Sequence, residues 1–130
     1  MDSLLSKEVY VYLGEFRYQI RKFQNFSDKA ARDNGLTSQQ HQLLLAIMGY
    51  PGRDFVTTGE LAERMQITNH ACVGLIDRCE HLELVSRRQN PEDGRSVLIE
   101  VTEKGRKILE RLSEIHLDEI RRIEIFKKII

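Results

Sequence analysis

The residues best suited to contact another molecule surround a turn-forming segment in the second half of the chain. Asn90-Pro91-Glu92-Asp93-Gly94 is dense in turn formers, and Arg95 follows it directly. A guanidinium at the tip of such a turn can enter a narrow A·T-rich minor groove of DNA, where the negative potential is enhanced. Asp93 is placed to orient Arg95 or to pair with Arg78, and the sequence leaves both interpretations open.

A second set of candidate contact residues lies on one side of a helix that we expect from about residue 69 to 83. The side predicted to face the core carries Cys72, Leu75, Ile76 and Cys79. The opposite side carries His70, Val73, Gly74, Asp77 and His81. A solvated face more often carries Lys, Glu or Gln. Gly74 would allow another surface to approach closely, and Val73 could contact a thymine methyl group. The alternative is that both residues arose by neutral drift and have no role in binding.

The start of this helix adds three polar candidates, Thr68, Asn69 and His70. Their polar groups, together with the positive end of the helix dipole, would face phosphates or base edges. The pair Arg87 and Arg88 follows on a predicted strand, where alternation lets at most one of them face DNA.

Catalytic and cofactor chemistry is not indicated. The sequence has no Gly-rich phosphate loop, no His/Cys cluster with metal spacing and no nucleophile elbow, and its four histidines fall on separate elements. We therefore expect no enzyme, no cofactor and no metal. Cys72 and Cys79 are interpreted as small buried hydrophobes, with a redox sensor as the alternative; two turns of helix keep them too far apart to bridge.

Bulk properties predict one globular domain of 130 residues, with 41% hydrophobic and 31% charged residues. No apolar run approaches the ~20 residues of a membrane span. The N-terminus has no secretory pattern, so a cytoplasmic location is expected. The formal net charge is zero, which gives no global attraction to nucleic acid.

The elements that would position these residues are mostly helices. Residues 4–33 read as one long helix that ends at Asn34-Gly35. Its narrow apolar stripe would pack on a second helix or in the core of the same subunit, and these alternatives stay open. The stripe consists of Val9, Leu13, Phe16, Ile20 and Phe23.

Two capping boxes, Thr37 to Gln40 and Thr57 to Glu60, start a second helix that runs to about Gly49 and a short third helix. The third helix, a turn and the helix from about 69 form a helix-turn-helix layout. A β-hairpin of residues 84–89 and 96–101 follows, and a last helix at about 103–128 has a broad apolar face. That face carries Ile108, Leu112, Ile115, Ile120, Ile123 and Phe126. The predicted fold is mainly α with a small β-hairpin wing.

These segments resemble the MarR (multiple antibiotic resistance regulator) family of bacterial transcription factors. Asp93-Gly94-Arg95, followed after five residues by Val101-Thr102-Glu103-Lys104-Gly105, matches the family wing pattern D-x-R-x5-[LV]-T-x-x-G. Residues 59–62 resemble the start of the family's third helix. Residues 75–78 and 84–87 resemble the end of its recognition helix and the beginning of its wing. Many members carry Thr-Arg where this chain has Val73-Gly74, so a base-reading arginine is missing there.

The resemblance implies a single domain made of a winged helix-turn-helix at residues 36–105 and dimerisation helices at residues 1–35 and 106–130. It implies a homodimer on a pseudo-palindromic operator, with the helix from about 69 in a major groove and the wing on a minor groove. It further implies a repressor relieved by a small-molecule effector bound between the first, second and last helices. The expected DNA contacts are Thr68, Asn69, His70, Val73, Gly74, Arg78, Arg88, Asp93 and Arg95, and the expected effector contacts are Phe23, Phe26, His41 and Leu44.

The net charge of the region expected to contact DNA is negative, which disfavours binding to phosphates. Residues 57–101, here called the reading region, contain five basic and eight acidic residues, a net charge of −3. Phosphate contacts would therefore come largely from helix N-termini, backbone N–H groups and hydroxyls. The alternative function is a winged-helix module that docks a protein and binds no DNA. The zero net charge and the Val73-Gly74 surface favour this alternative, whereas the intact Asp93-x-Arg95 tip disfavours it.

Overall fold

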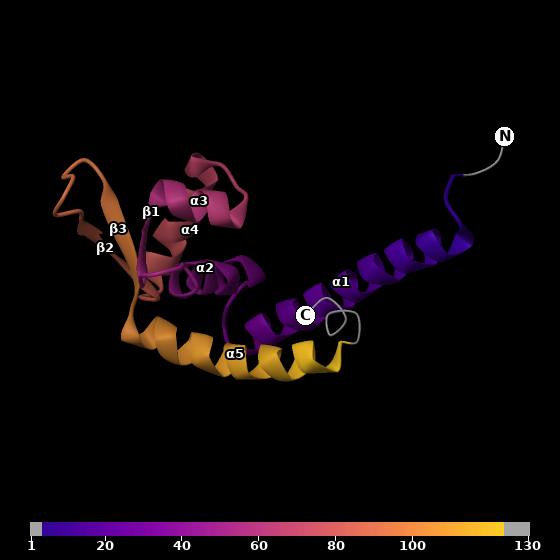
Figure 1. The fold of residues 1–130 in the computed structure, drawn as a ribbon. Helices are drawn as coiled ribbons and strands as arrows, with labels where there is room; N and C mark the ends of the chain where they lie inside the picture. The colour runs from indigo at the N-terminus through magenta and orange to yellow at the C-terminus, as the bar shows by residue number, and fades with distance from the viewer. Residues whose placement is uncertain (1–3, 124–130) are drawn as a thin grey trace.

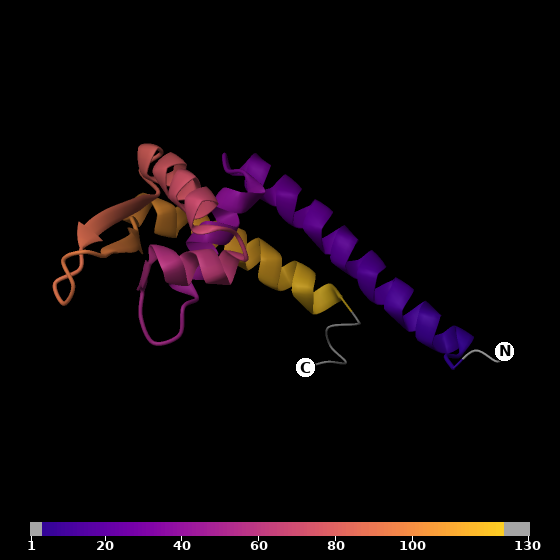
Figure 2. The same cartoon turned by 90° about the horizontal axis from the view of Figure 1, so that it is seen from above.

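The computed structural model describes residues 4–123 as five helices and a small sheet (Figures 1 and 2). The helices are α1 (Lys7–Asp33), α2 (Ser38–Met48), α3 (Thr58–Met65), α4 (Asn69–His81) and α5 (Glu103–Arg122). The strands are β1 (Phe55–Thr57), β2 (Val85–Gln89) and β3 (Val97–Val101). None of these helices is long and apolar enough to cross a membrane. The mainly helical fold with a β-hairpin wing is confirmed.

Helix α1 is an arm whose C-terminal end alone belongs to the core. It leaves the body on the side away from the hairpin (Figures 1 and 2), and its buried residues are Ser27, Ala30 and Ala31. Gly35 ends the helix as expected, with a φ of +81°. Leu13, in the middle of the apolar stripe, is 51% exposed. Packing in its own core is therefore the wrong interpretation for Leu13.

Helices α2, α3 and α4 begin where the sequence predicted. Thr37 and Thr57 form capping boxes with Gln40 and Glu60, and Thr68 caps α4 by accepting the N–H of Ala71 at 3.1 Å. These helices share one hydrophobic core with the sheet and α5. The side of α4 expected to face inward is buried throughout, and both cysteines are free.

Burial explains why the cysteines are unsuited to redox chemistry. It raises the pKa of the Cys72 thiol, and it raises the pKa of Cys79 to about 11. Because the thiolate is the reactive form, both residues serve as small hydrophobic side chains.

The sheet contains a strand that the sequence analysis missed. β1 pairs antiparallel with β3, which also pairs antiparallel with β2, so the strand order is β1-β3-β2. β1 is only three residues long and follows the Pro51-Gly52 turn, too short to show an alternating pattern. It attaches the start of α3 to the base of the wing. Leu98 is buried on the sheet face opposite Ile99, so both faces of β3 are covered.

The first turn of α5 holds the connection between α4 and β2. The Thr102 hydroxyl donates to the carbonyl of Glu83 at 2.6 Å, and the Thr102 N–H donates to the carbonyl of Leu84 at 3.0 Å. The Lys104 ammonium donates to the carbonyl of Leu82 at 2.9 Å. Gly105 packs so closely here that a Cβ atom would overlap the carbonyl oxygen of Leu84 and lie 2.8 Å from Cγ1 of Val101. The Thr-x-x-Gly pattern is thus a clamp between the last helix and the reading region.

Beyond the clamp, the buried side of α5 differs in detail from the expectation. Leu109, Leu112 and His116 are buried, whereas Ile115 is 38% exposed. Phe126 lies outside the described residues.

Candidate nucleic-acid interface

The exposed side of α4 carries the residues that the sequence placed there. His70, Val73, Asp77 and His81 are exposed, and Gly74 is half-buried. Thr68 and Asn69 are exposed at the N-terminus of the helix, where the uncapped N–H groups and the positive end of the helix dipole also point outward. The surface is polar at one end, and the Arg78 guanidinium lies beside Gly74.

The acidic residues of α4 are neutralised from the wing. Arg87 on β2 donates to Asp77 at 2.6 Å through Nη2 and to Glu80 at 2.8 Å through Nη1. One guanidinium therefore joins two carboxylates on successive turns of α4 and fixes the base of the wing against the helix. The negative charge counted over the reading region is, on this side of α4, partly compensated, since one guanidinium faces two carboxylates.

At the wing tip, Asp93 organises the backbone before Arg95. Its Oδ1 accepts the N–H of Arg95 at 3.0 Å and lies 3.8 Å from the Arg95 Nε. Of the two open interpretations, Asp93 therefore orients Arg95 and forms no ion pair with Arg78. The Arg95 side chain is 97% exposed, so its guanidinium extends into solvent beyond the turn.

A hollow separates the wing tip from the start of α3. It is about 590 Å³ in volume and is lined on the α3 side by Thr57, Thr58 and Gly59 and on the wing side by Asn90, Asp93, Arg95, Ser96 and Val97. Hydroxyl, amide and guanidinium donors line this concave, solvent-open strip together with the Asp93 carboxylate, which already accepts the Arg95 N–H. Its chemistry suits a phosphate backbone passing between the helix-turn-helix and the wing.

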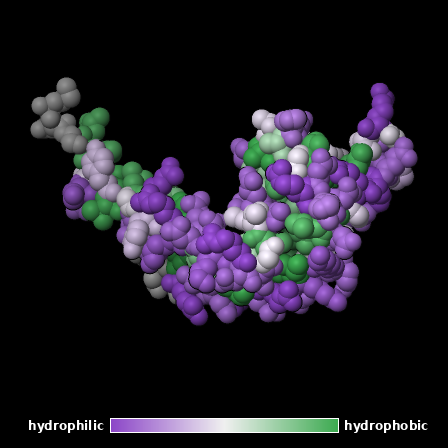
Figure 3. Space-filling view, turned by 180° about the vertical axis from the view of Figure 1, so that it is seen from behind, coloured by the Kyte–Doolittle hydropathy of each residue, from purple (hydrophilic) through white to green (hydrophobic). Residues whose placement is uncertain are grey.

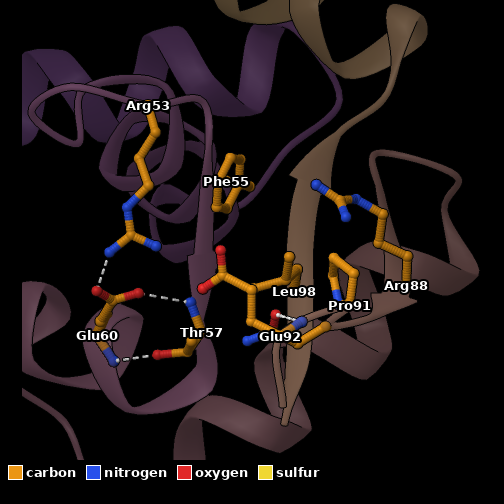
Figure 4. Close-up of a pocket in the computed structure, with 9 residues that line it drawn as sticks. Arg53, Phe55, Thr57, Glu60, Arg88, Pro91, Glu92 and Leu98 are labelled. Atoms are coloured by element: carbon orange, nitrogen blue, oxygen red, sulfur yellow. Dashed lines mark hydrogen bonds and ion pairs between the residues drawn. The ribbon is translucent and has the colours of Figure 1, made fainter. Parts of the chain in front are cut away.

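Arg88 lies on the outer face of the sheet and not at the tip (Figure 4). Its Nε donates to Glu100, and its guanidinium carbon lies 5.3 Å from the centre of the Phe55 ring. The guanidinium of Arg53 approaches the same ring at 5.2 Å. Arg88 is thus already paired, which distinguishes it from Arg95 among the expected DNA contacts.

Sequence analysis missed the residues that support this outer face. Glu60 accepts hydrogen bonds from Tyr50, Arg53 and the Thr57 N–H. Burial alone would raise the pKa of Glu60, but these donors lower it to about 2, so the carboxylate stays charged. The capping box at Thr57 was a usable signal for Glu60, but nothing in the sequence placed Arg53 or Tyr50 beside it.

A buried histidine pair occupies the junction of α1, α2 and α5. The rings of His41 and His116 are 4.7 Å apart, and Phe23 and Phe26 contact His116 edge-on at 5.8 and 5.7 Å. His116 is held by the Leu112 carbonyl and the Ser27 hydroxyl, at 2.6 and 2.8 Å.

Three of the four expected effector contacts therefore meet around one residue, His116, that the sequence did not single out. Leu44, the fourth, is fully buried in the core. The Nδ1 atom of His41 is buried without a hydrogen-bond partner among the described residues.

His41 should make the stability of the protein depend on pH. Burial, and then repulsion from His116, lower its pKa to about 4, whereas an unfolded histidine has a pKa near 6.5. Below about pH 6.5 the unfolded chain takes up a proton that the folded chain refuses, so the free energy of unfolding falls between about pH 6.5 and pH 4. The total loss from this one group is about 3 kcal/mol, of which about 2 kcal/mol is lost by pH 5.

Urea unfolding at pH 7.5 and pH 5.0, compared between the wild type and His41→Leu, measures this contribution. The variant should lose about 2 kcal/mol less than the wild type on acidification. Equal losses in both proteins would show that His41 is not the titrating group.

Comparison with known proteins agrees with this arrangement. A family model described as MarR family matches residues 34–96. The HTH-type transcriptional repressor YetL of Bacillus subtilis is 31% identical over 86 residues, which are 66% of this chain and 51% of YetL. The chain thus spans about half the length of the curated relative it matches.

Solved structures of the same fold cover most of the chain. AbsC, a MarR family regulator from Streptomyces coelicolor, has a TM-score of 0.78 at 20% identity and covers 95% of this chain and 83% of its own. A MarR mutant from E. coli complexed with operator DNA has a TM-score of 0.67 at 25% identity, with 86% and 78% covered. A Staphylococcus aureus MepR mutant bound to an oligodeoxyribonucleotide has a TM-score of 0.70 at 25% identity, with 87% and 79% covered. The family model covers the capped helix-turn-helix and the first strand of the wing, and AbsC shares the fold of most of the chain, so the chain is similar to the MarR family in both comparisons.

Proposed function

We propose that this protein is a transcriptional regulator that binds duplex DNA as a homodimer, with α4 in the major groove and the wing tip in the adjacent minor groove. The observation that carries the proposal is Arg95, whose guanidinium is 97% exposed and makes only a 3.8 Å contact with Asp93, on a tip that Asp93 orders. The relatives solved with DNA have the same fold, which supports the same mode of binding.

The positions of the charged side chains determine which groups would contact the DNA phosphates. Within the reading region, Arg87 and Arg88 are paired with carboxylates, which leaves Arg64, Arg78 and Arg95 as the cations directed to solvent. Helix N-termini and the donors around the hollow between α3 and the wing supply the remaining contacts. We therefore expect modest non-specific affinity and a shallow salt dependence.

The homodimer is supported by the exposed arm. Green patches lie toward the outer end of the arm in Figure 3, where the outer part of α1 presents aliphatic and aromatic side chains to solvent. They include Tyr10, Val11, Tyr12, Leu13 and Tyr18. A helix of this length without tertiary packing is only marginally stable in water, so a partner has to cover it. A second copy of α1, together with the outer side of α5, is the partner that fits a two-fold operator.

Replacing Leu13 by aspartate should break the dimer without unfolding the subunit, because Leu13 makes no core contact within its own chain. Sedimentation velocity at micromolar concentration should show the wild type at twice 15.2 kDa and Leu13→Asp at 15.2 kDa. Asn25→Asp adds the same charge at an exposed polar position of α1 and should stay dimeric. A dimeric Leu13→Asp protein would place the interface elsewhere.

Repression relieved by a small molecule is the finer part of the proposal. The unsatisfied Nδ1 of His41 supports an effector contact at the junction of α1, α2 and α5, because the His41 ring lies against His116, which also contacts Phe23 and Phe26. An effector that binds there would act by shifting the dimer between arrangements with different spacings of the two α4 helices.

The test of the proposed function is footprinting on the DNA upstream of the protein's own gene. We expect protection of an inverted repeat whose half-sites lie about one helical turn apart. If no sequence is protected at any salt concentration, the protein is not a DNA-binding regulator of its own gene, and the protein-docking alternative gains support.

A further inference from the structure

The recognition helix contains an arginine that lies across a glycine. An ideal Cβ atom placed on Gly74 would lie 3.6 Å from Nη1 of Arg78, so the Arg78 guanidinium covers the site where a side chain of residue 74 would begin. Long helical side chains point back toward the helix N-terminus, which carries the charge of Arg78 one turn closer to the start of α4. A Cβ atom at residue 74 would only be in ordinary van der Waals contact with the guanidinium, whereas a longer side chain would occupy its place.

The Arg78 guanidinium is also not held in an ion pair among the described residues. The neighbouring acids, Asp77 and Glu80, are both paired with Arg87 from the wing. Among residues 4–123, Arg78 has no ion pair and no ring contact, and its side chain is exposed. The carboxylates that would otherwise hold its guanidinium on the flank of α4 are thus occupied from the other side of the helix.

The Arg78 guanidinium lies over the part of α4 with which a helix-turn-helix contacts bases. The N-terminal half of the second helix of the motif enters the major groove, and Gly74 is in the middle of the exposed side of α4, between His70 and Asp77. Val73 and Gly74 themselves offer no hydrogen-bond donor from a side chain. A guanidinium over Gly74 would be the strongest donor on this surface, and its fork of N–H groups matches O6 and N7 of guanine.

We infer that Arg78, laid over Gly74, is the specificity-determining residue of α4 and reads one guanine in each half-site of the operator. This inference rests on the proposed function, since it requires that α4 meet duplex DNA. Gly74 acts as a positioning residue, because it leaves room for the guanidinium and adds no side chain of its own.

The experiment uses duplexes selected from a random pool by the wild-type protein. Each guanine of the selected site is replaced in turn by 7-deazaguanine, which lacks the N7 acceptor, and dissociation constants are measured by fluorescence anisotropy. We expect one symmetric guanine position at which the replacement weakens wild-type binding about 10-fold. Arg78→Ala should bind the natural and modified duplexes equally.

Three further variants separate base reading from charge and from folding. Arg78→Lys keeps the charge but loses the fork, so it should discriminate between the duplexes less than the wild type. Gly74→Leu keeps Arg78 but fills its place, and it should also lose the preference. Arg64→Ala, on α3, should weaken binding to both duplexes and keep the preference. Thermal unfolding midpoints confirm that each variant is folded.

Each binding result has a different meaning for the role of Arg78. If Arg78→Ala weakens natural and modified duplexes equally and still discriminates between them, Arg78 contacts phosphate and the inference is wrong. A wild-type protein that shows no sensitive guanine also overturns it, while the proposed function stands. A wild-type protein that binds no duplex at all overturns the proposed function and this inference together.

Discussion

Arg95→Ala is expected to lower the affinity of the dimer for its operator by about 10- to 100-fold, from the loss of one minor-groove guanidinium in each subunit. The Arg95 side chain is 97% exposed, with only a 3.8 Å approach to Asp93. Removing it leaves the turn intact, because Asp93 holds the backbone N–H of residue 95 and not the side chain alone. Competition anisotropy with a labelled operator duplex measures the loss.

Arg88→Ala is the matched control for this effect. It removes the same group from the same hairpin, but Arg88 is already paired with Glu100 and lies against Phe55 on the outer face of the sheet. We expect a loss of less than about threefold, in line with the small effect of a surface ion pair. Equal losses for the two variants would show that general charge, and not the wing tip, provides the affinity.

Gly105→Ala is expected to destabilise the fold by about 2 to 3 kcal/mol, which corresponds to roughly 10 °C in the unfolding midpoint. The added methyl group would overlap the Leu84 carbonyl oxygen and crowd Val101, and neither is the flexible end of a side chain. The clamp would have to open for the methyl group to fit. Because the clamp fixes α4, β2 and α5 relative to one another, DNA affinity should fall as well.

Gly59→Ala provides the control for the glycine substitution. Gly59 is on α3, and a Cβ atom there would meet nothing within 4 Å. Its replacement should leave stability unchanged or raise it by up to about 1 kcal/mol, as expected for glycine to alanine within a helix. Thermal unfolding midpoints of Gly59→Ala, Gly105→Ala and the wild type measure the two effects. A stable Gly105→Ala protein would mean that the close approach at the clamp is readily relieved.

The parts of the fold that were predictable from the sequence are those with local signals. Capping boxes at Thr37 and Thr57 gave two helix starts, and the turn formers before Arg95 gave the hairpin. β1 was missed because three residues show no periodicity, and its identity as a strand depends on pairing with β3, more than 40 residues away.

The contacts of charged and polar side chains were much less predictable. Arg87 and Arg88 look equivalent in the sequence, but alternation along β2 sends one to α4 and the other to the outer face of the sheet. His116 becomes the centre of the buried histidine pair through Ser27, 89 residues away in the chain. Such partners are set by tertiary packing, which leaves no short-range pattern to recognise.

The dependence of operator affinity on salt reports both whether the protein binds duplex DNA and how many of its cations contact the DNA. Within residues 4–123, the guanidinium groups of Arg64, Arg78 and Arg95 donate no hydrogen bond to a carboxylate. Three such arginines in each subunit predict a saturable complex of one dimer per duplex, with a slope of log K against log salt no steeper than about −6. A steeper slope would show that the DNA lies on a basic surface other than the reading region. No saturable binding at any salt concentration would contradict the account as a whole.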